Sequence, residues 1–180
     1  MPGFGIGPLH LGMTVLEANK AAKQEHLSPP SPFSDGSKIQ IGFYAEGDTS
    51  VETIFRNGSL AVMIVGADRH FITSTGITTF GLLSYDPPNP WVIPGSTKLD
   101  FEHSGKSVSC SDYPGSSDKQ VCVYEDPKTR YTVASTAYET CSASQAKQGC
   151  NWPAPDWYIN GLGVATDKGW RLYKTLSHLP

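Results

Sequence analysis

The spacing of apolar residues near the start of the chain predicts a helix over residues 14–26. Val15, Ala18 and Ala22 recur at intervals of three and four positions, which places them on one face of a helix. We expect the helix to end before Ser28-Pro29-Pro30, because proline and the residue before it do not continue a helix.

The start of this helix carries its own signal. Thr14 and Glu17 have the spacing of a capping box, in which each side chain accepts a hydrogen bond from the backbone N–H of the other residue. Met13 stands just before the cap, where it can pack against Ala18. The preceding arm, residues 5–12, is apolar and interrupted by glycines, so we expect it to bend closely over the core.

The rest of the chain favours short strands, because β-branched and aromatic residues recur in runs bounded by turn residues. We expect strands at 38–45, 50–56, 59–65, 70–74, 97–103, 106–110, 119–125 and 129–135. Asn57 and Gly58 between two of these runs predict a two-residue hairpin turn of the primed type. A short helix is expected near residues 136–141. The predicted fold class is α+β: an N-terminal capped helix packed on a mostly antiparallel sheet, followed by a disulfide-stapled, loop-rich C-terminal half.

The length of 180 residues fits one composite domain over residues 1–180. Residues 28–37 form a predicted loop, and the proline-rich stretch 87–94 is expected to be irregular. The domain has two possible halves: residues 1–86 contain the helix and a sheet, and residues 95–180 contain the cysteines and further strands.

Composition narrows the class of partner. The net charge is -3 and no run of Lys or Arg occurs, which argues against nucleic-acid binding. Aromatic residues make up 11% of the chain, which argues against disorder. No stretch approaches the roughly 20 apolar residues of a membrane span. The first residues lack the features of a signal peptide, so the protein is either cytoplasmic or has lost an N-terminal signal or lipid anchor.

The cysteines favour export. All four lie in the second half of the chain and none forms a C-x-x-C pair, which argues against a zinc or thioredoxin-type site. Three disulfide connectivities are possible, and we favour Cys110–Cys122 and Cys141–Cys150 because neighbours close the smallest loops. The alternative is four buried free thiols in a cytosolic protein. With two disulfides, the predicted location is periplasmic or secreted.

The phrase "GIGPLHLGMTVLEA" at residues 5–18 resembles the first helix of small exported bacterial α+β domains, often lipoproteins. Outer-membrane assembly lipoproteins and the beta-lactamase-inhibitor protein share this helix-then-sheet plan. The residues that match are Gly7, Pro8, Leu9, Leu11, Gly12, Met13 and Thr14. A second phrase, "FITSTGITTFG" at residues 71–81, is similar to one that follows the sheet in such domains. The resemblance implies a fold and carries over no active site.

The sequence offers no recognisable catalytic constellation, cofactor motif or dedicated metal site. Glu102, His103 and Ser104 are consecutive, but in the strand expected there they point to alternate faces and do not converge. Asp112 and Asp118 bracket a glycine-containing loop and suggest a weak calcium site. They lack the dense alternation of a calcium loop, so a solvated turn is the favoured interpretation.

Partner binding has more support in the sequence. Tyr113, Trp152 and Trp157 lie in or beside loops that disulfides would stiffen, and Tyr and Trp dominate interface hot spots. The alternative is that the tryptophans fill the edge of the core. Residues 103–113 also resemble a loop of periplasmic lysozyme inhibitors that enters the target's cleft, with Ser104, Lys106 and Tyr113 as the matching types.

The functional hypothesis is therefore an exported, non-enzymatic inhibitor or immunity protein that blocks a secreted enzyme or toxin. Its partner-binding residues would be Ser104, Lys106, Tyr113, Trp152 and Trp157. A structural or envelope-assembly module and a secreted hydrolase without a recognisable motif are the alternatives.

Overall fold

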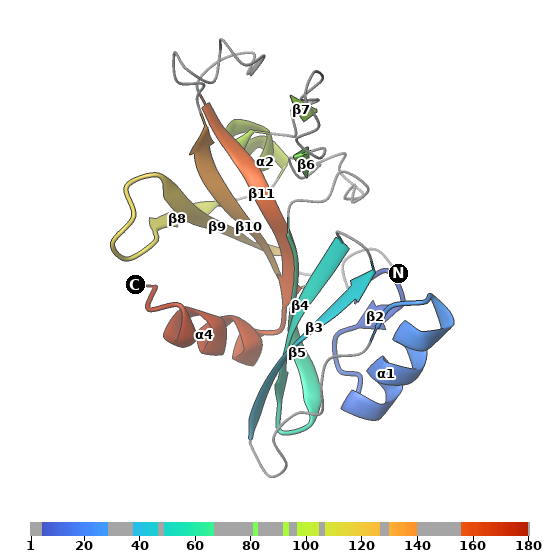
Figure 1. Cartoon of the computed structure of the whole chain (residues 1–180). Helices are drawn as coiled ribbons and strands as arrows, with labels where there is room; N and C mark the ends of the chain where they lie inside the picture. Colours follow the sequence, from blue (N-terminus) through green and yellow to red (C-terminus); the bar gives the residue numbers. More distant parts are fainter. Residues whose placement is uncertain are drawn as a thin grey trace.

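A computed structural model describes residues 5–28, 38–46, 49–66, 81–82, 92–93, 97–104, 107–126, 130–139 and 156–179. Its centre is a seven-stranded antiparallel sheet with the order β3-β4-β5-β11-β10-β9-β8 (Figure 1). The strands are β3 Ile39–Glu46, β4 Thr49–Arg56, β5 Ser59–Val65, β8 Ser109–Asp112, β9 Lys119–Asp126, β10 Arg130–Glu139 and β11 Asp156–Ala165. Two small pairs, β1 Gly5–Ile6 with β2 Leu9–His10 and β6 Gly81–Leu82 with β7 Val92–Ile93, lie outside it.

Helix α1, Val15–Gln24, confirms the predicted N-terminal helix and its cap. The backbone N–H of Thr14 donates to Glu17 Oε2 at 2.8 Å, and the N–H of Glu17 donates to Thr14 Oγ1 at 3.2 Å. Ala18 and Ala22 are fully buried in a cluster with residues of β3, β4 and β5. The predicted packing of this helix on an antiparallel sheet is therefore confirmed.

The turn between β4 and β5 is also confirmed. Asn57 has a φ of 51° and Gly58 a φ of 77°, and two successive positive φ angles define the predicted primed turn. Both residues tolerate this left-handed conformation better than most others.

One sheet contains strands from both halves of the sequence. Strand β5 pairs antiparallel with β11, with Val65 opposite Leu162 and Val62 opposite Ala165. The partners are separated by about a hundred residues in the sequence, and this pairing joins the two halves.

Helices cover both faces of this sheet. Leu162 and Val164 point to one face of β11, where Leu162 packs with Phe101 of helix α2, Lys98–Ser104, and Val164 packs in the cluster of α1. Ala165 points to the other face and packs with Tyr173 of α4, Asp167–Leu176. In Figure 1, α4 lies on the side opposite α1, below the projecting β8–β9 hairpin.

Two predictions about secondary structure are wrong. Residues 97–103 were expected to be a strand, but Lys98–Ser104 form helix α2. Thr97 and Asp100 explain the difference: the N–H of Thr97 donates to Asp100 Oδ2 at 2.7 Å, and the N–H of Asp100 donates to Thr97 Oγ1 at 3.3 Å. This reciprocal cap starts a helix. A helix was expected near 136–141, but residues 136–139 belong to β10.

The remaining strands follow the predictions with shifted ends. Strand β8 begins at Ser109, later than expected, because Ser107 has a positive φ of 57° that interrupts an extended chain. Strand β9 matches the prediction closely, and β10 runs four residues further than expected. The strand predicted at 70–74 lies outside the described residues, and so does the loop predicted at 28–37 except for Ser28, which forms a β-bridge with Ala45.

Candidate functional site

The β8–β9 hairpin is closed by the predicted disulfide Cys110–Cys122. The two cysteines are directly opposed in the register of the strands, with Cα atoms 4.0 Å apart. Cys122 is fully buried and packs with Phe101 of α2. The disulfide therefore joins the hairpin to the core on the α2 face. Cys141 and Cys150 lie outside the described residues, so their pairing stays a prediction.

Residues 113–118, which we call the hairpin loop, connect the two strands. The N–H of Tyr113 donates to the carbonyl of Lys119 at 3.0 Å, and the N–H of Ser116 donates to the carbonyl of Tyr113 at 3.0 Å. Gly115 has a φ of 76°, a conformation that favours glycine. The loop is thus a hydrogen-bonded turn whose tip is exposed to solvent.

The two aspartates considered as a weak calcium site, Asp112 just before this loop and Asp118 at its end, make hydrogen bonds with protein groups. Asp112 Oδ1 accepts a hydrogen bond from Gln120 Nε2 at 2.7 Å, across the strand pair. Asp118 accepts a hydrogen bond from the hydroxyl of Ser116, and this bond lowers the pKa of the Asp118 carboxyl. Among the described residues, no group of three His, Cys, Asp or Glu side chains is placed to hold a metal ion.

The hairpin loop is tied to helix α4 by two tyrosines. The hydroxyl oxygens of Tyr113 and Tyr173 lie 2.8 Å apart and share a hydrogen bond. Burial is the main cause that raises the pKa of Tyr173 above its ordinary value, and the contact with Tyr113 raises it further. The charge of Glu52 on β4 also raises the pKa of Tyr173. Burial in turn raises the pKa of the Glu52 carboxyl.

Helix α4 is seated by a close backbone contact. The side chain of Thr166 caps the helix by accepting from the N–H of Gly169 at 3.0 Å, and the N–H of Thr166 donates to the carbonyl of Ala61 at 2.9 Å. A Cβ atom on Gly169 would lie 2.1 Å from that carbonyl oxygen. Only glycine lets the first turn of α4 lie this close to β5.

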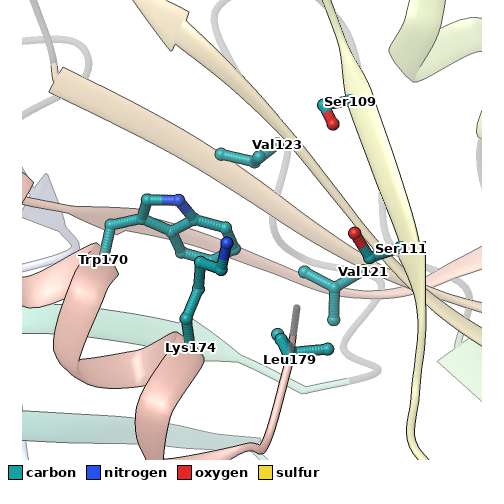
Figure 2. A pocket seen from close by; sticks show the side chains of 7 residues that line it. All are labelled: Ser109, Ser111, Val121, Val123, Trp170, Lys174 and Leu179. Atoms are coloured by element: carbon teal, nitrogen blue, oxygen red, sulfur yellow. The ribbon is translucent and has the colours of Figure 1, made fainter.

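A pocket of about 220 Å³ lies between α4 and the β8–β9 hairpin (Figure 2). Side chains from both strands and from the helix point into it. No sequence prediction named this site, because its walls are separated by about fifty residues in the chain. The pattern Thr166-x-x-Gly169 with Trp170 and Tyr173 at helical spacing was the available signal for α4.

On the α2 face, Lys98 connects three elements. Its ammonium forms an ion pair with Glu102 at 3.7 Å, donates to Gln120 Oε1 at 2.9 Å, and lies 5.9 Å from the ring centroid of Trp157. Trp157 is half-buried. This position agrees with the alternative in which the tryptophan fills an edge of the core.

Those of the predicted partner-binding residues that the structure describes lie on two different faces of the sheet. Tyr113 is half-buried and contacts α4, whereas Trp157 and the end of α2 at Ser104 belong to the opposite face of the sheet. Lys106 and Trp152 lie outside the described residues. Contacts of these five residues with a partner stay predictions. The consecutive Glu102, His103 and Ser104 belong to helix α2 and not to the expected strand, and successive positions of a helix lie about 100° apart around its axis.

Comparison with known proteins adds no assignment: no family model, curated protein or solved structure was found to match the chain. The resemblance of its opening to exported bacterial domains therefore stays a prediction. Within the described ranges, none of the helices has the length and apolar character needed to cross a membrane.

Proposed function

We propose that this protein is an exported, non-enzymatic binding protein, of the inhibitor or immunity class, whose hairpin loop enters a partner enzyme or toxin. The observation that carries the proposal is the anchoring of the loop at three points. The Cys110–Cys122 disulfide, the Gln120–Asp112 hydrogen bond and the Tyr113–Tyr173 hydrogen bond all restrain it.

Anchoring matters because association costs conformational entropy. A loop that already has its bound shape loses less freedom on binding, and inhibitors of enzymes commonly bind with little backbone change. The hairpin loop projects from the body of the protein in Figure 1, so a concave partner surface has access to it.

The exposed chemistry of the loop suits a polar cleft. Pro114, Gly115, Ser117 and Asp118 are exposed at its tip. Tyr113 takes the role of an anchor, because its hydroxyl is engaged by α4. The carboxylate of Asp118 would face hydrogen-bond donors or a cation of the partner, and a charged rim contact of this kind speeds association.

The test is site-specific photo-cross-linking with the oxidised protein. A photoreactive phenylalanine derivative replaces Ser117 at the tip of the loop, and in a matched control it replaces Lys20 on the exposed side of α1. Each protein is mixed with the envelope and secreted fractions of the producing cells, and cross-linked species are identified by mass spectrometry.

We expect one enzyme or toxin to cross-link from position 117 and not from position 20. Its activity should fall on addition of the unlabelled protein, and the double substitution Ser117→Arg/Asp118→Arg should restore that activity. Cross-links to envelope-assembly components, or equal yields from both positions, would contradict the proposal.

A further inference from the structure

The pocket between α4 and the β8–β9 hairpin combines an apolar wall with an ammonium group. We propose that it binds a small monocarboxylic acid with an apolar body, such as a single-ring aromatic acid or a short fatty acid. This site is separate from the exposed tip of the hairpin loop, so the two proposals can fail independently.

The apolar wall comes from both sides of the pocket. Val121 and Val123 of β9 point into it from the sheet, the indole of Trp170 faces them from α4, and Leu179 closes one end (Figure 2). Trp170 is held in place by Tyr131 and Tyr173, whose ring centroids lie 6.1 and 5.9 Å from its own. The wall is therefore fixed before any ligand binds, which lowers the entropic cost of binding.

The polar groups come from the helix and from the edge strand. Lys174 of α4 lines the pocket together with Ser109 and Ser111 of β8. Both serines point to this side because Cys110 between them points to the opposite face. Within the described part of the chain, Lys174 has no ion-pair partner. An ammonium on one wall of the pocket and serine hydroxyls on the opposite wall offer a charge and a hydrogen-bond donor to one carboxylate group.

The size of the pocket limits the ligand. Its volume of about 220 Å³ is below the roughly 300–1,000 Å³ that is typical for drug-sized ligands. A nucleotide is too large for it, whereas one ring or a short chain with a single carboxylate is of the right scale.

The bond between Tyr113 and Tyr173 helps to keep the pocket open. It fixes the end of the hairpin to α4 at a distance of 2.8 Å between hydroxyl oxygens, three residues from Trp170 along the helix. Helix and hairpin are thereby held as two walls of the pocket (Figure 2).

The experiment follows the indole N–H resonance of Trp170 in the ¹⁵N-labelled full chain by NMR. Benzoate and hexanoate are titrated as probes, with benzyl alcohol and 1-hexanol as neutral counterparts. N-acetylphenylalanine serves as a probe for the carboxylate of a peptide terminus. The variants are Lys174→Met, Val123→Phe, which fills the apolar half, and Lys168→Met, a matched control on the exposed side of α4.

We expect saturable shifts with benzoate or hexanoate and a Kd on the order of 1 mM. Lys174→Met should raise Kd about tenfold or more, because a hydrogen bond to a charged group is lost. Val123→Phe should abolish the shifts, and Lys168→Met should leave Kd unchanged. Thermal unfolding of each variant shows whether it is folded.

Four results would overturn the assignment. They are an absence of saturable shifts in the folded wild type, equal binding of acids and alcohols, equal effects of the two lysine substitutions, and binding of N-acetylphenylalanine alone. The last result would reassign the site to a peptide terminus.

Discussion

The hydroxyl oxygens of Tyr113 and Tyr173 lie 2.8 Å apart, and their hydrogen bond fastens the β8–β9 hairpin to helix α4. Tyr113 begins the hairpin loop, and Tyr173 belongs to α4 and is only 7% exposed. This bond restrains the loop of the proposed function and one side of the proposed carboxylate pocket.

The substitution Tyr113→Phe should lower the free energy of unfolding by about 0.5–1.5 kcal/mol, because the hydrogen bond between the two hydroxyls is lost while Ser177 remains a partner of the Tyr173 hydroxyl. Urea denaturation of both proteins measures the change. Tyr124→Phe is the control, since the ring of Tyr124 packs on Phe101 with centroids 5.2 Å apart and its hydroxyl makes no hydrogen bond to other described residues. Equal losses in the two variants would contradict a specific role for the bond.

The disulfide Cys110–Cys122 should stabilise the fold by about 3 kcal/mol, since it closes a loop of about a dozen residues in the unfolded chain. The paired substitution Cys110→Ser/Cys122→Ser leaves the rest of the chain unchanged and should lower the midpoint of thermal unfolding. Calorimetry measures this midpoint. If the unfolding midpoint is retained, the hairpin is held by its hydrogen bonds alone.

Glu52 should make stability depend on pH. Burial raises the pKa of its carboxyl above 4.5, so the folded state favours the neutral acid. The neutral Glu52 carboxyl therefore favours the folded state at pH values below 4.5. This contribution to the free energy of unfolding is lost as the pH rises through the raised pKa of Glu52. Glu52→Gln should therefore stabilise the protein at pH 7 and have little effect at pH 3.

Urea denaturation at both pH values tests this dependence on Glu52. The exposed Glu125 on the same sheet provides the matched substitution Glu125→Gln. A gain in stability that is equal at pH 3 and pH 7, or equal for the two variants, would show that desolvation of the Glu52 carboxylate is not the cause.

The parts of the fold that were predictable have local causes. The capping box of Thr14 and Glu17 and the turn at Asn57 and Gly58 are each encoded within four residues, and both are confirmed. The Cys110–Cys122 disulfide was also predictable, because the two cysteines are neighbours in the sequence and lie on the two strands of one hairpin. Helix α2 had a local signal too, the Thr97–Asp100 cap, but the alternation of Leu99 and Phe101 with charged residues also fits a strand.

The parts that were not predictable depend on contacts between distant segments. Nothing near Val65 indicates that it pairs with Leu162, and nothing near Tyr113 indicates that Tyr173 lies beside it. The carboxylate pocket needs β9 and α4 to be placed first, so its residues carry no common motif. An aromatic residue in a disulfide-closed loop drew attention to Tyr113. The sequence could not tell whether its side chain would contact a partner or, as the structure shows, bond to Tyr173 of α4.

The close seating of α4 yields the last prediction. Gly169→Ala places a methyl group 2.1 Å from the carbonyl oxygen of Ala61, a backbone atom that cannot yield without moving β5. Despite the higher helix propensity of alanine, this overpacking should destabilise the protein by about 1–3 kcal/mol. Lys168→Ala, one residue earlier and exposed, should be neutral or slightly stabilising. Chemical denaturation compares the two variants.

The same substitution has a second readout, because α4 forms one wall of the carboxylate pocket. Gly169→Ala should also shift the indole N–H resonance of Trp170. An unchanged resonance together with unchanged stability would mean that α4 does not pack on β5 at this distance.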